Sequence, residues 1–262
     1  MNTNIETFQS LHQQTQPLLL ANAWDAGSAR LIESLGFSAI ATTSAGVAWS
    51  LGYQDGSKMP LEEVFAAAKR IVSAVSIAVS VDFEDGYDSD PVKVADNTKY
   101  LMEIGVVGIN LEDGTDAPEL LAEKIKHIKG AGSLFINART DVFLRGFGEP
   151  ESRAEETIRR GLLYKEAGAD CLFVPGIADP GQIQAIANEV SMPINVLAWP
   201  DLKSANELAQ VGVKRISLGS SMTQSIYEKT REIASQFLNT GTVDHLWPKS
   251  MDFGQIQNLV SR

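Results

Sequence analysis

The stretch AVSVDFEDGYDSDP, residues 78–91, decides the fold of this chain. It begins as a buried β-strand should and then places five carboxylates within nine residues: Asp82, Glu84, Asp85, Asp88 and Asp90. Acidic residues are poor strand formers, and like charges repel one another. The role of an acidic cluster at the end of a core strand depends on the kind of sheet to which the strand belongs.

The same pattern, a short apolar run followed by a longer amphipathic stretch, repeats along the chain. Alternation of this kind predicts βα units around a parallel sheet. The eight strand candidates are LLLAN (18–22), SAIATT (38–43), IAVSVD (77–82), VGINLE (107–112), LFINART (134–140), CLFVPG (171–176), INVLAW (194–199) and RISLG (215–219).

The segments between these runs carry the start and stop signals of helices. Ser152 with Glu155 predicts a capping box, while Asp90 and Asp179 each precede a proline and predict helix N-caps. Four glycines stand just before strand candidates, where a helix ends in a left-handed residue: Gly36, Gly105, Gly168 and Gly212. Four similar turns indicate one repeating unit.

Eight βα units in 262 residues predict an α/β protein, a (β/α)8 TIM barrel whose functional groups lie at the C-terminal ends of the strands. A doubly wound open sheet is the main alternative, but the first strand is followed by NAWDAGSA rather than by G-x-G-x-x-G. No linker-like stretch divides the chain, so residues 1–262 are predicted to form one barrel domain. Residues 239–262 are predicted to be a C-terminal tail that covers a barrel or subunit surface with Trp247, Met251, Phe253, Ile256 and Leu259.

The bulk composition excludes several classes of partner. The net charge is −11 and the pI about 4.8, without a basic run, which argues against nucleic acid and anionic membranes as partners. One cysteine, Cys171, excludes an internal disulfide, and no apolar window reaches the roughly 20 residues of a membrane span. The chain also begins without a signal-like segment, so we expect a cytoplasmic protein.

Charged side chains follow four neighbouring strand candidates. They are Asp55 in LGYQDG beyond TTSAG, Asp82 and Glu84 after the third strand, Glu112 and Asp113 after the fourth, and Arg139 and Asp141 after the fifth. In a barrel these groups face one mouth. Carboxylates that share a site need a cation, and an oxygen-only set without His or Cys favours Mg2+ or Mn2+.

Other polar residues of the same region have simpler interpretations. Arg139 offers a planar fork for a carboxylate or phosphonate. Asp113 and Asp141 are either solvated loop residues or supports for Arg139 and the metal waters, and Asp88 and Asp90 are loop and cap residues. The residues together predict a site for a small dianionic molecule chelated to Mg2+.

At this point the motifs are similar to those of a known group of enzymes, the isocitrate lyase and phosphoenolpyruvate mutase superfamily. The resemblance covers nearly the whole chain and rests on LLLANAWDAGSARLIESLGFSAIATTSAG, LGYQDG, VDFEDGY, GINLEDG, INARTD and AGADCLFVPG. The chain most resembles the branch called phosphonomutase-like or carboxyvinyl-carboxyphosphonate phosphorylmutase-like. This resemblance implies a barrel whose eighth helix is exchanged between subunits, in homodimers or homotetramers. It also implies Mg2+, and a C–C or C–P bond made or broken beside an α-keto acid through a pyruvate enolate.

The resemblance also assigns roles to individual positions. It makes Asp82 the principal Mg2+ aspartate, Glu84 the second acidic metal position and Glu112 the carboxylate on the next strand. Asp55 corresponds to an aspartate near the metal waters, and Arg139 to the arginine that holds the substrate's carboxylate and enolate side. The turn of Thr43, Ser44 and Ala45 corresponds to the one that receives the substrate carboxylate. Arg139, Asp55 and Glu112 are accordingly the expected catalytic residues.

Three departures narrow the expected reaction. Glu84 replaces the Asp that is common at that position. The lyases of the superfamily carry a KKCGH-like loop after the fourth strand, whereas EDGTDAPELLAEKI contains no Cys or His and no Lys before Lys124, and the longer mutase gating loop is missing too. FVPG replaces the His or Glu that often follows the sixth strand. The enolate half of the site is present, and the half that selects the leaving group is not recognisable.

Three hypotheses follow from these observations. The first is a Mg2+-dependent lyase or mutase-like enzyme acting on a small keto acid or phosphonate, with oxaloacetate decarboxylation as an attractive version. The second is a keto-acid-binding pseudoenzyme of the same fold without turnover. The third is an aldolase-like barrel with a Schiff-base lysine, which is disfavoured because no strand candidate contains an interior lysine and Lys214 only precedes the last one.

Overall fold

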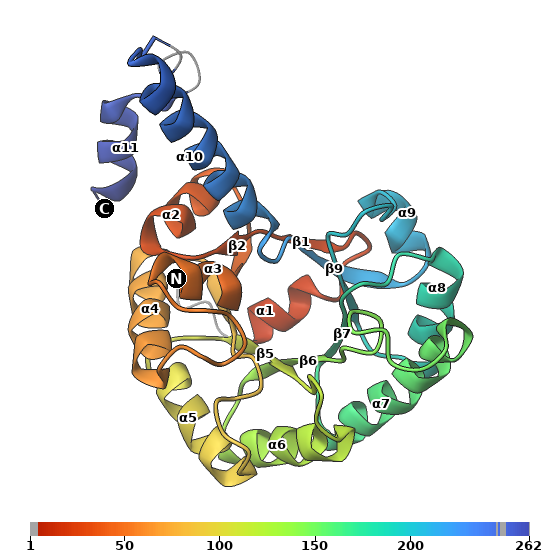
Figure 1. Cartoon of the computed structure of the whole chain (residues 1–262). Coiled ribbons are helices and arrows are strands. Elements are labelled where there is room, and N and C mark those ends of the chain that lie inside the picture. The colour runs from red at the N-terminus through yellow and green to blue at the C-terminus, as the bar shows by residue number, and fades with distance from the viewer. Residues whose placement is uncertain (1–4, 245, 247–249, 262) are drawn as a thin grey trace.

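The computed structural model describes residues 5–244, 246 and 250–261. Nine parallel strands form its centre: β1 (Leu18–Leu20), β2 (Asn22–Ala23), β3 (Ala39–Thr42), β4 (Ala78–Asp82), β5 (Gly108–Glu112), β6 (Phe135–Arg139), β7 (Cys171–Val174), β8 (Ile194–Leu197) and β9 (Val213–Ser217). β1 pairs with β9 and β2 pairs with β3, so the sheet curls into a nearly closed barrel (Figure 1). The predicted TIM barrel is confirmed.

Helices surround this barrel (Figure 1). They are α1 (Ile5–Leu11), α2 (Ala26–Ser34), α3 (Ser44–Ser50), α4 (Leu61–Ala74), α5 (Pro91–Glu103), α6 (Pro118–Ala131), the short 3-10 helix η1 (Pro150–Ser152), α7 (Arg153–Ala167), α8 (Pro180–Val190), α9 (Ala205–Gln210), α10 (Ser221–Thr240) and α11 (Phe253–Val260). α1 closes the N-terminal end of the barrel, where Phe8 packs edge-on against Phe135 at 5.0 Å between ring centroids.

Two strand boundaries differ from the prediction. The first predicted strand is two short strands, because Ala21 interrupts the run between β1 and β2. The last strand begins at Val213, two residues earlier than predicted, so Lys214 lies inside β9. Its Nζ donates to the carbonyl of Gln14 at 2.9 Å, outside the barrel interior, and it is therefore no Schiff-base candidate.

The observed helix ends confirm most of the predicted start and stop signals. Asp90 accepts from Val92 N at 2.9 Å and Asp179 accepts from Gln182 N at 2.8 Å, so both are N-caps. The four glycines before strands have φ between +88° and +107°, which L-residues rarely adopt. The capping box at Ser152 is wrong: its hydroxyl donates to the carbonyl of Glu149, because a 3-10 turn precedes α7.

The middle of the barrel interior is polar. TIM-barrel interiors are usually filled by layers of bulky branched residues. Here the interior holds polar side chains from β4, β5, β6, β8 and β9, and all are at most 4% exposed: Ser80, Asn110, Asn137, Asn195 and Arg215. Register pairs Asn110 with Asn137 and Asn195 with Arg215. These side chains adjoin the strand ends that carry the acids, since register pairs Asn110 with Asp82.

The C-terminal segment extends away from the ring. α10 runs outward and α11 turns back beside α2 (Figure 1). Met251, Phe253 and Ile256 of the predicted tail are 42% to 76% exposed, and Trp247 lies outside the described residues. The single-domain division and the exchange of the eighth helix stay predictions.

No helix among the described residues combines the length and the apolar character needed to cross a bilayer. The cytoplasmic location stays a prediction.

Candidate active site at the carboxyl ends of the strands

Asp82 ends β4, and both of its carboxylate oxygens are held. Ser44 N donates to Oδ2 at 3.1 Å, and the Asn110 amide donates to Oδ1 at 3.4 Å. Thr42 accepts from the backbone N–H of Asp82 at 2.8 Å. Because each carboxylate oxygen has two lone pairs, one on each remains for a further partner. The aspartate is thus fixed in orientation but not saturated.

Glu84 anchors a neighbouring loop. Its Oε1 accepts from Gly56 N at 2.9 Å and from Ser57 N at 2.6 Å, and its Oε2 accepts from the hydroxyl of Tyr87. Its φ of +47° is an unusual backbone conformation for a residue other than glycine. Glu84 therefore fastens the segment that carries Asp55 to the end of β4.

Arg139 lies between two carboxylates. Its Nη1 is 2.7 Å from Glu112 Oε2, and its Nε and Nη2 bind Asp141 at 2.7 and 3.1 Å. The same Asp141 also accepts from Arg145 at 2.8 Å, and its side chain is fully buried. Two-point bonding of this kind fixes the plane of the guanidinium.

Asp113 supports this pair from behind. It accepts from the hydroxyl of Tyr164 at 2.6 Å, from Arg160 at 2.8 Å and from Asp141 N at 2.9 Å. Of the two interpretations of Asp113 and Asp141, the structure therefore selects the supporting one: both are buried and neither is a solvated loop residue. Asp141 steadies Arg139 directly, and Asp113 steadies the backbone of Asp141.

The turn Thr43–Ala45 lies beside Asp82. The Thr43 hydroxyl accepts from Gly46 N at 3.4 Å and so caps α3, and the Ser44 hydroxyl hydrogen bonds to Asp55. Ala45 is 7% exposed in the first turn of α3. The turn therefore joins two of the candidate carboxylates. Its role as the receiver of the substrate carboxylate stays a prediction.

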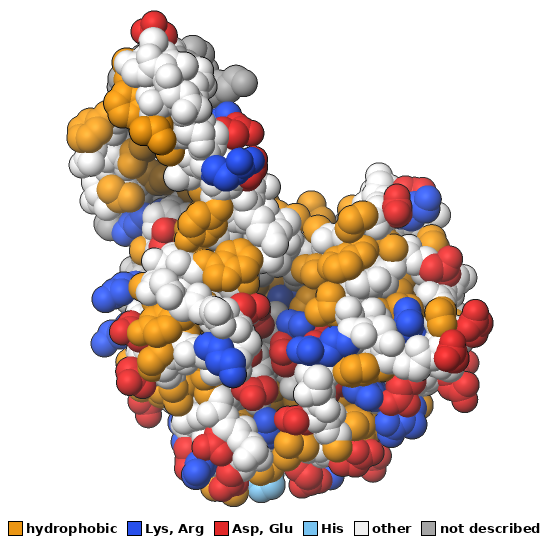
Figure 2. Space-filling view, in the orientation of Figure 1, with side chains coloured by type: hydrophobic (Ala, Val, Ile, Leu, Met, Phe, Trp, Pro, Cys, Tyr) orange, Lys and Arg blue, Asp and Glu red, His pale blue; other side chains and the backbone are white. Residues whose placement is uncertain are grey.

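The carboxylates are close enough to disturb one another. Burial raises the pKa of Asp55, and the charge of Asp82 raises it further. Burial also raises the pKa of Glu84 and of Glu112, again with a contribution from Asp82, although Arg139 opposes the shift at Glu112. Figure 2 shows acidic and basic side chains facing one another around the hollow at the centre of the ring. Positive charge brought to this mouth would relieve the repulsion.

The carboxylates at this mouth suit a Mg2+ ion that is bound by few side chains. No three acidic, His or Cys side chains among the described residues converge closely enough to chelate a metal ion together. Mg2+, however, is commonly bound by one or two carboxylates and keeps several of its waters. An oriented Asp82 with free lone pairs, surrounded by carboxylates that repel it, suits such an ion. Glu84 has both oxygens engaged and is better placed to act through water.

Several residues of this region were not predicted from the sequence. Tyr87, Ser57 and Lys124 bind the loops around Glu84, and Lys124 does so as a buried lysine donating to the carbonyl of Asp85 at 2.7 Å. No pattern predicts such contacts across elements. Asn110 could have been found, because it is two residues before Glu112 and a strand of period two turns both toward the interior.

Other reactive groups lie away from the mouth. Cys171 is fully buried within the barrel, and burial raises the pKa of its thiol to about 12. His12 is buried at the opposite end, and His127 is exposed on α6. None of these three groups lies where it could serve as a general acid at the strand ends.

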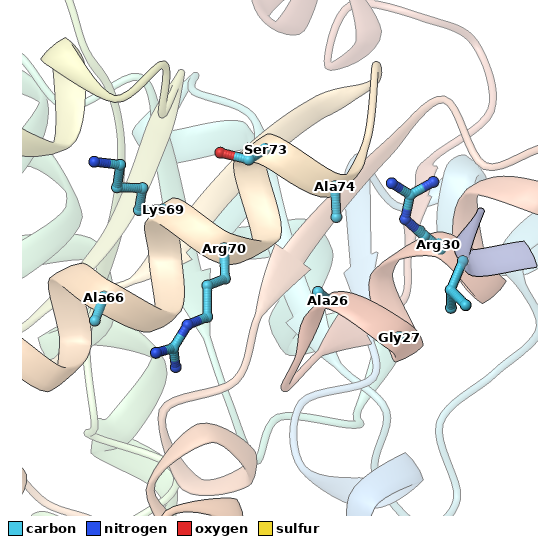
Figure 3. A pocket seen from close by; sticks show the side chains of 9 residues that line it. Ala26, Gly27, Arg30, Ala66, Lys69, Arg70, Ser73 and Ala74 are labelled. Atoms are coloured by element: carbon cyan, nitrogen blue, oxygen red, sulfur yellow. The ribbon is translucent and has the colours of Figure 1, made fainter. Parts of the chain in front are cut away.

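A groove on the outer helical layer is also no rival site. It lies between α2 and α4 and is lined by Arg30, Lys69 and Arg70 among others (Figure 3). The three cationic side chains point in different directions and do not converge on one point. Functional groups of barrels of this class lie at the strand ends instead.

Comparison with known proteins identifies the family. The family model described as phosphoenolpyruvate phosphomutase matches residues 8–238. An uncharacterised protein of Mycobacterium tuberculosis strain H37Rv is 39% identical over 220 residues, covering 82% of each chain. A Burkholderia cenocepacia J2315 protein described as a phosphonomutase superposes with a TM-score of 0.84 at 36% identity, covering 89% of this chain and 100% of the other.

A relative with an assigned activity is the oxaloacetate decarboxylase of Pseudomonas entomophila strain L48. It is 28% identical over 209 residues, which cover 74% of this chain and 71% of the decarboxylase. The chain belongs to the phosphoenolpyruvate phosphomutase family, within the isocitrate lyase and phosphoenolpyruvate mutase superfamily.

Proposed function

We propose that this protein is a Mg2+-dependent lyase or mutase-like enzyme that makes or breaks a C–C or C–P bond next to an α-keto acid. The observation that carries the proposal is the joint placement of Asp82, Glu112 and Arg139 at the ends of three consecutive strands. Bound there, Mg2+ would supply positive charge that stabilises a pyruvate-enolate-type intermediate as the neighbouring bond breaks. Mn2+ is the expected substitute.

Different residues would bind the cation and the substrate. Asp82 would hold the metal, with Glu84, Glu112 and Asp55 around its waters. Arg139 would bind the substrate's carboxylate, and Asp141 keeps its guanidinium in one plane. Glu112, whose pKa burial raises and whose carboxylate is 2.7 Å from Arg139, would be the group that moves a proton.

Oxaloacetate decarboxylation is the version that the structure favours. In this reaction the C–C bond to the carboxylate breaks, CO2 leaves, and the remaining enolate takes a proton to give pyruvate. The reaction needs little from a lid, and the segment from Asp113 to Ala117 between β5 and α6 is only five residues long. A relative with this activity supports the same choice.

Turnover of oxaloacetate and phosphonopyruvate by the purified protein, with and without Mg2+, tests the proposal. We expect Mg2+-dependent formation of pyruvate, and we expect Asp82→Asn to lower kcat/KM by about 100-fold or more. Asp96→Asn, which removes an exposed carboxylate paired only with Lys99, is the matched control and should leave the rate unchanged. The Asp82→Asn protein also corrects for decarboxylation by Mg2+ in solution.

A pseudoenzyme of the same fold is the second candidate. The specific observation behind it is the lack, among the described residues of this mouth, of the Cys or His that would protonate a leaving group. Calorimetric binding of oxalate, an enolate mimic, without turnover of either keto acid would favour it. Turnover that does not depend on the metal would contradict both candidates.

A further inference from the structure

Arg215 places an unpaired charge in the middle of the barrel. Its side chain on β9 is fully buried, and its Nε donates to the hydroxyl of Ser217 at 3.1 Å. Its Nη2 donates to Asn110 Oδ1 at 3.3 Å, and its Nη1 has no hydrogen-bond partner among the described residues. Within the part of the chain that the structure describes, no carboxylate lies within ion-pair distance of it.

Such a residue is expensive for the fold. A buried charge without a counter-ion costs several kcal/mol, and barrel interiors of this class are normally filled by branched apolar residues. Burial lowers the pKa of Arg215 to about 10, which leaves the guanidinium charged at neutral pH. A destabilising charge in a position where an apolar residue would fit indicates a use beyond packing.

The contacts of Asn110 show where this charge acts. Asn110 Oδ1 accepts from both Arg215 and Asn137, the latter at 2.8 Å. Its Nδ2 donates to Asp82 Oδ1 at 3.4 Å, and Asp82 is its register partner on β4. The side chain of Asn110 therefore joins Arg215 to the candidate metal aspartate, and Asp82 is the carboxylate whose charge acts on Arg215.

We propose that Arg215 acts electrostatically on the mouth: it lends the surroundings of Asp82 a fixed positive charge from the barrel interior. This inference rests on the proposed function. A fixed cation beneath the site opposes the binding of a second cation and favours the binding of an anion. Arg215 therefore weakens the hold on the metal and strengthens the hold on the dianionic substrate and its enolate.

Two binding measurements on the full-length protein test the inference. Mn2+ binding is followed by electron paramagnetic resonance, and oxalate binding at saturating Mg2+ is followed by calorimetry. Arg215→Met, which keeps an unbranched apolar stem and removes the charge, should lower the Kd for Mn2+ and raise the Kd for oxalate, each by roughly tenfold. Arg215→Lys, which keeps the charge, should stay within about threefold of the unchanged protein in both.

The opposite signs separate an electrostatic role from a structural one. If Arg215 only shaped the barrel, Arg215→Met would weaken both ligands together or leave both unchanged, and either result overturns the inference. Cys171→Ala, an uncharged change within the same interior, is the matched control and should move neither Kd. Arg215→Gln provides the same comparison if Arg215→Met does not fold.

The failure of the proposed function would look different. In that case the unchanged protein would bind neither Mn2+ nor oxalate, or would bind both and turn over neither keto acid. Binding by the unchanged protein, with equal directions of change in Arg215→Met, contradicts the role of Arg215 alone.

Discussion

His12 shows how one buried side chain shapes the pH dependence of the whole protein. Its Nδ1 hydrogen bonds to the carbonyl of Phe8 at 2.9 Å, and its ring is stacked on Phe135. Its Nε2 has no hydrogen-bond partner in the part of the chain that the structure describes. Burial, with a contribution from the positive charge of Arg215, lowers the pKa of His12 from 6.5 to about 3. The folded protein therefore keeps this imidazole neutral where the unfolded chain protonates it.

We expect His12 to destabilise the protein in acid. Between pH 6.5 and 3 the unfolded chain binds more protons at this group, so the free energy of unfolding falls by about 1.4 kcal/mol per pH unit as the pH is lowered. His12→Asn, which can keep the bond to Phe8, should remove about 2 kcal/mol of the loss between pH 8 and pH 5. Urea unfolding at the two pH values measures this.

His127 is the control for that experiment. It makes the same bond, from Nδ1 to the carbonyl four residues earlier, but it is exposed on α6. His127→Asn should leave the pH dependence as it is. If the His12→Asn protein lost as much stability between pH 8 and pH 5 as the unchanged protein, groups other than His12 would cause the loss.

At the scale of elements, helix caps distinguish a true sequence signal from an apparent one. Asp179 accepts from Gln182 N at the start of α8, whereas Ser152, in an equally convincing motif, makes no side-chain cap bond. We expect Asp179→Ala to cost about 1 kcal/mol of stability. Ser152→Ala should cost less than about 0.5 kcal/mol, as an exposed substitution without a cap. Equal costs in urea unfolding would contradict the assignment.

Elements set by local chemistry could be predicted, and contacts across elements could not. The strands and the left-handed glycines follow from period and turn chemistry, which act within a few residues. The acids at the strand ends follow because a barrel turns those ends to one mouth. The three donors to Glu84 come from residues 56, 57 and 87, and the support of Arg139 comes from Asp113 and Asp141. Such pairings depend on the tertiary fold.

At the scale of the molecule, the C-terminal helices α10 and α11 expose large apolar side chains in a single chain. Phe237, Leu238 and Phe253 are 53%, 84% and 76% exposed on α10 and α11. Leu19, which faces outward from β1, is 51% exposed. Apolar surface of this extent on an extended arm suits a second copy of the chain, in line with the expected homodimer or homotetramer.

This surface predicts a measurable assembly. Sedimentation of the purified protein should give a dimer or tetramer, and Leu238→Asp should shift it toward monomer because burying a carboxylate there costs several kcal/mol. Leu162→Asp is the control, since Leu162 is 44% exposed on α7, away from the arm. A monomer at all concentrations in the unchanged protein would contradict the prediction.

The short segment after β5 has a consequence for the fate of the reacting molecule. Thr115, Asp116 and Ala117 are exposed and lie on a tight turn, in which Asp116 N donates to the carbonyl of Asp113 at 2.8 Å. A mutase must keep both fragments away from water until they recombine, and a five-residue turn offers little cover. An enolate formed at this mouth would meet solvent protons first, so the ordinary outcome would be quenching to a released keto acid, and the turnover assay would register it as pyruvate.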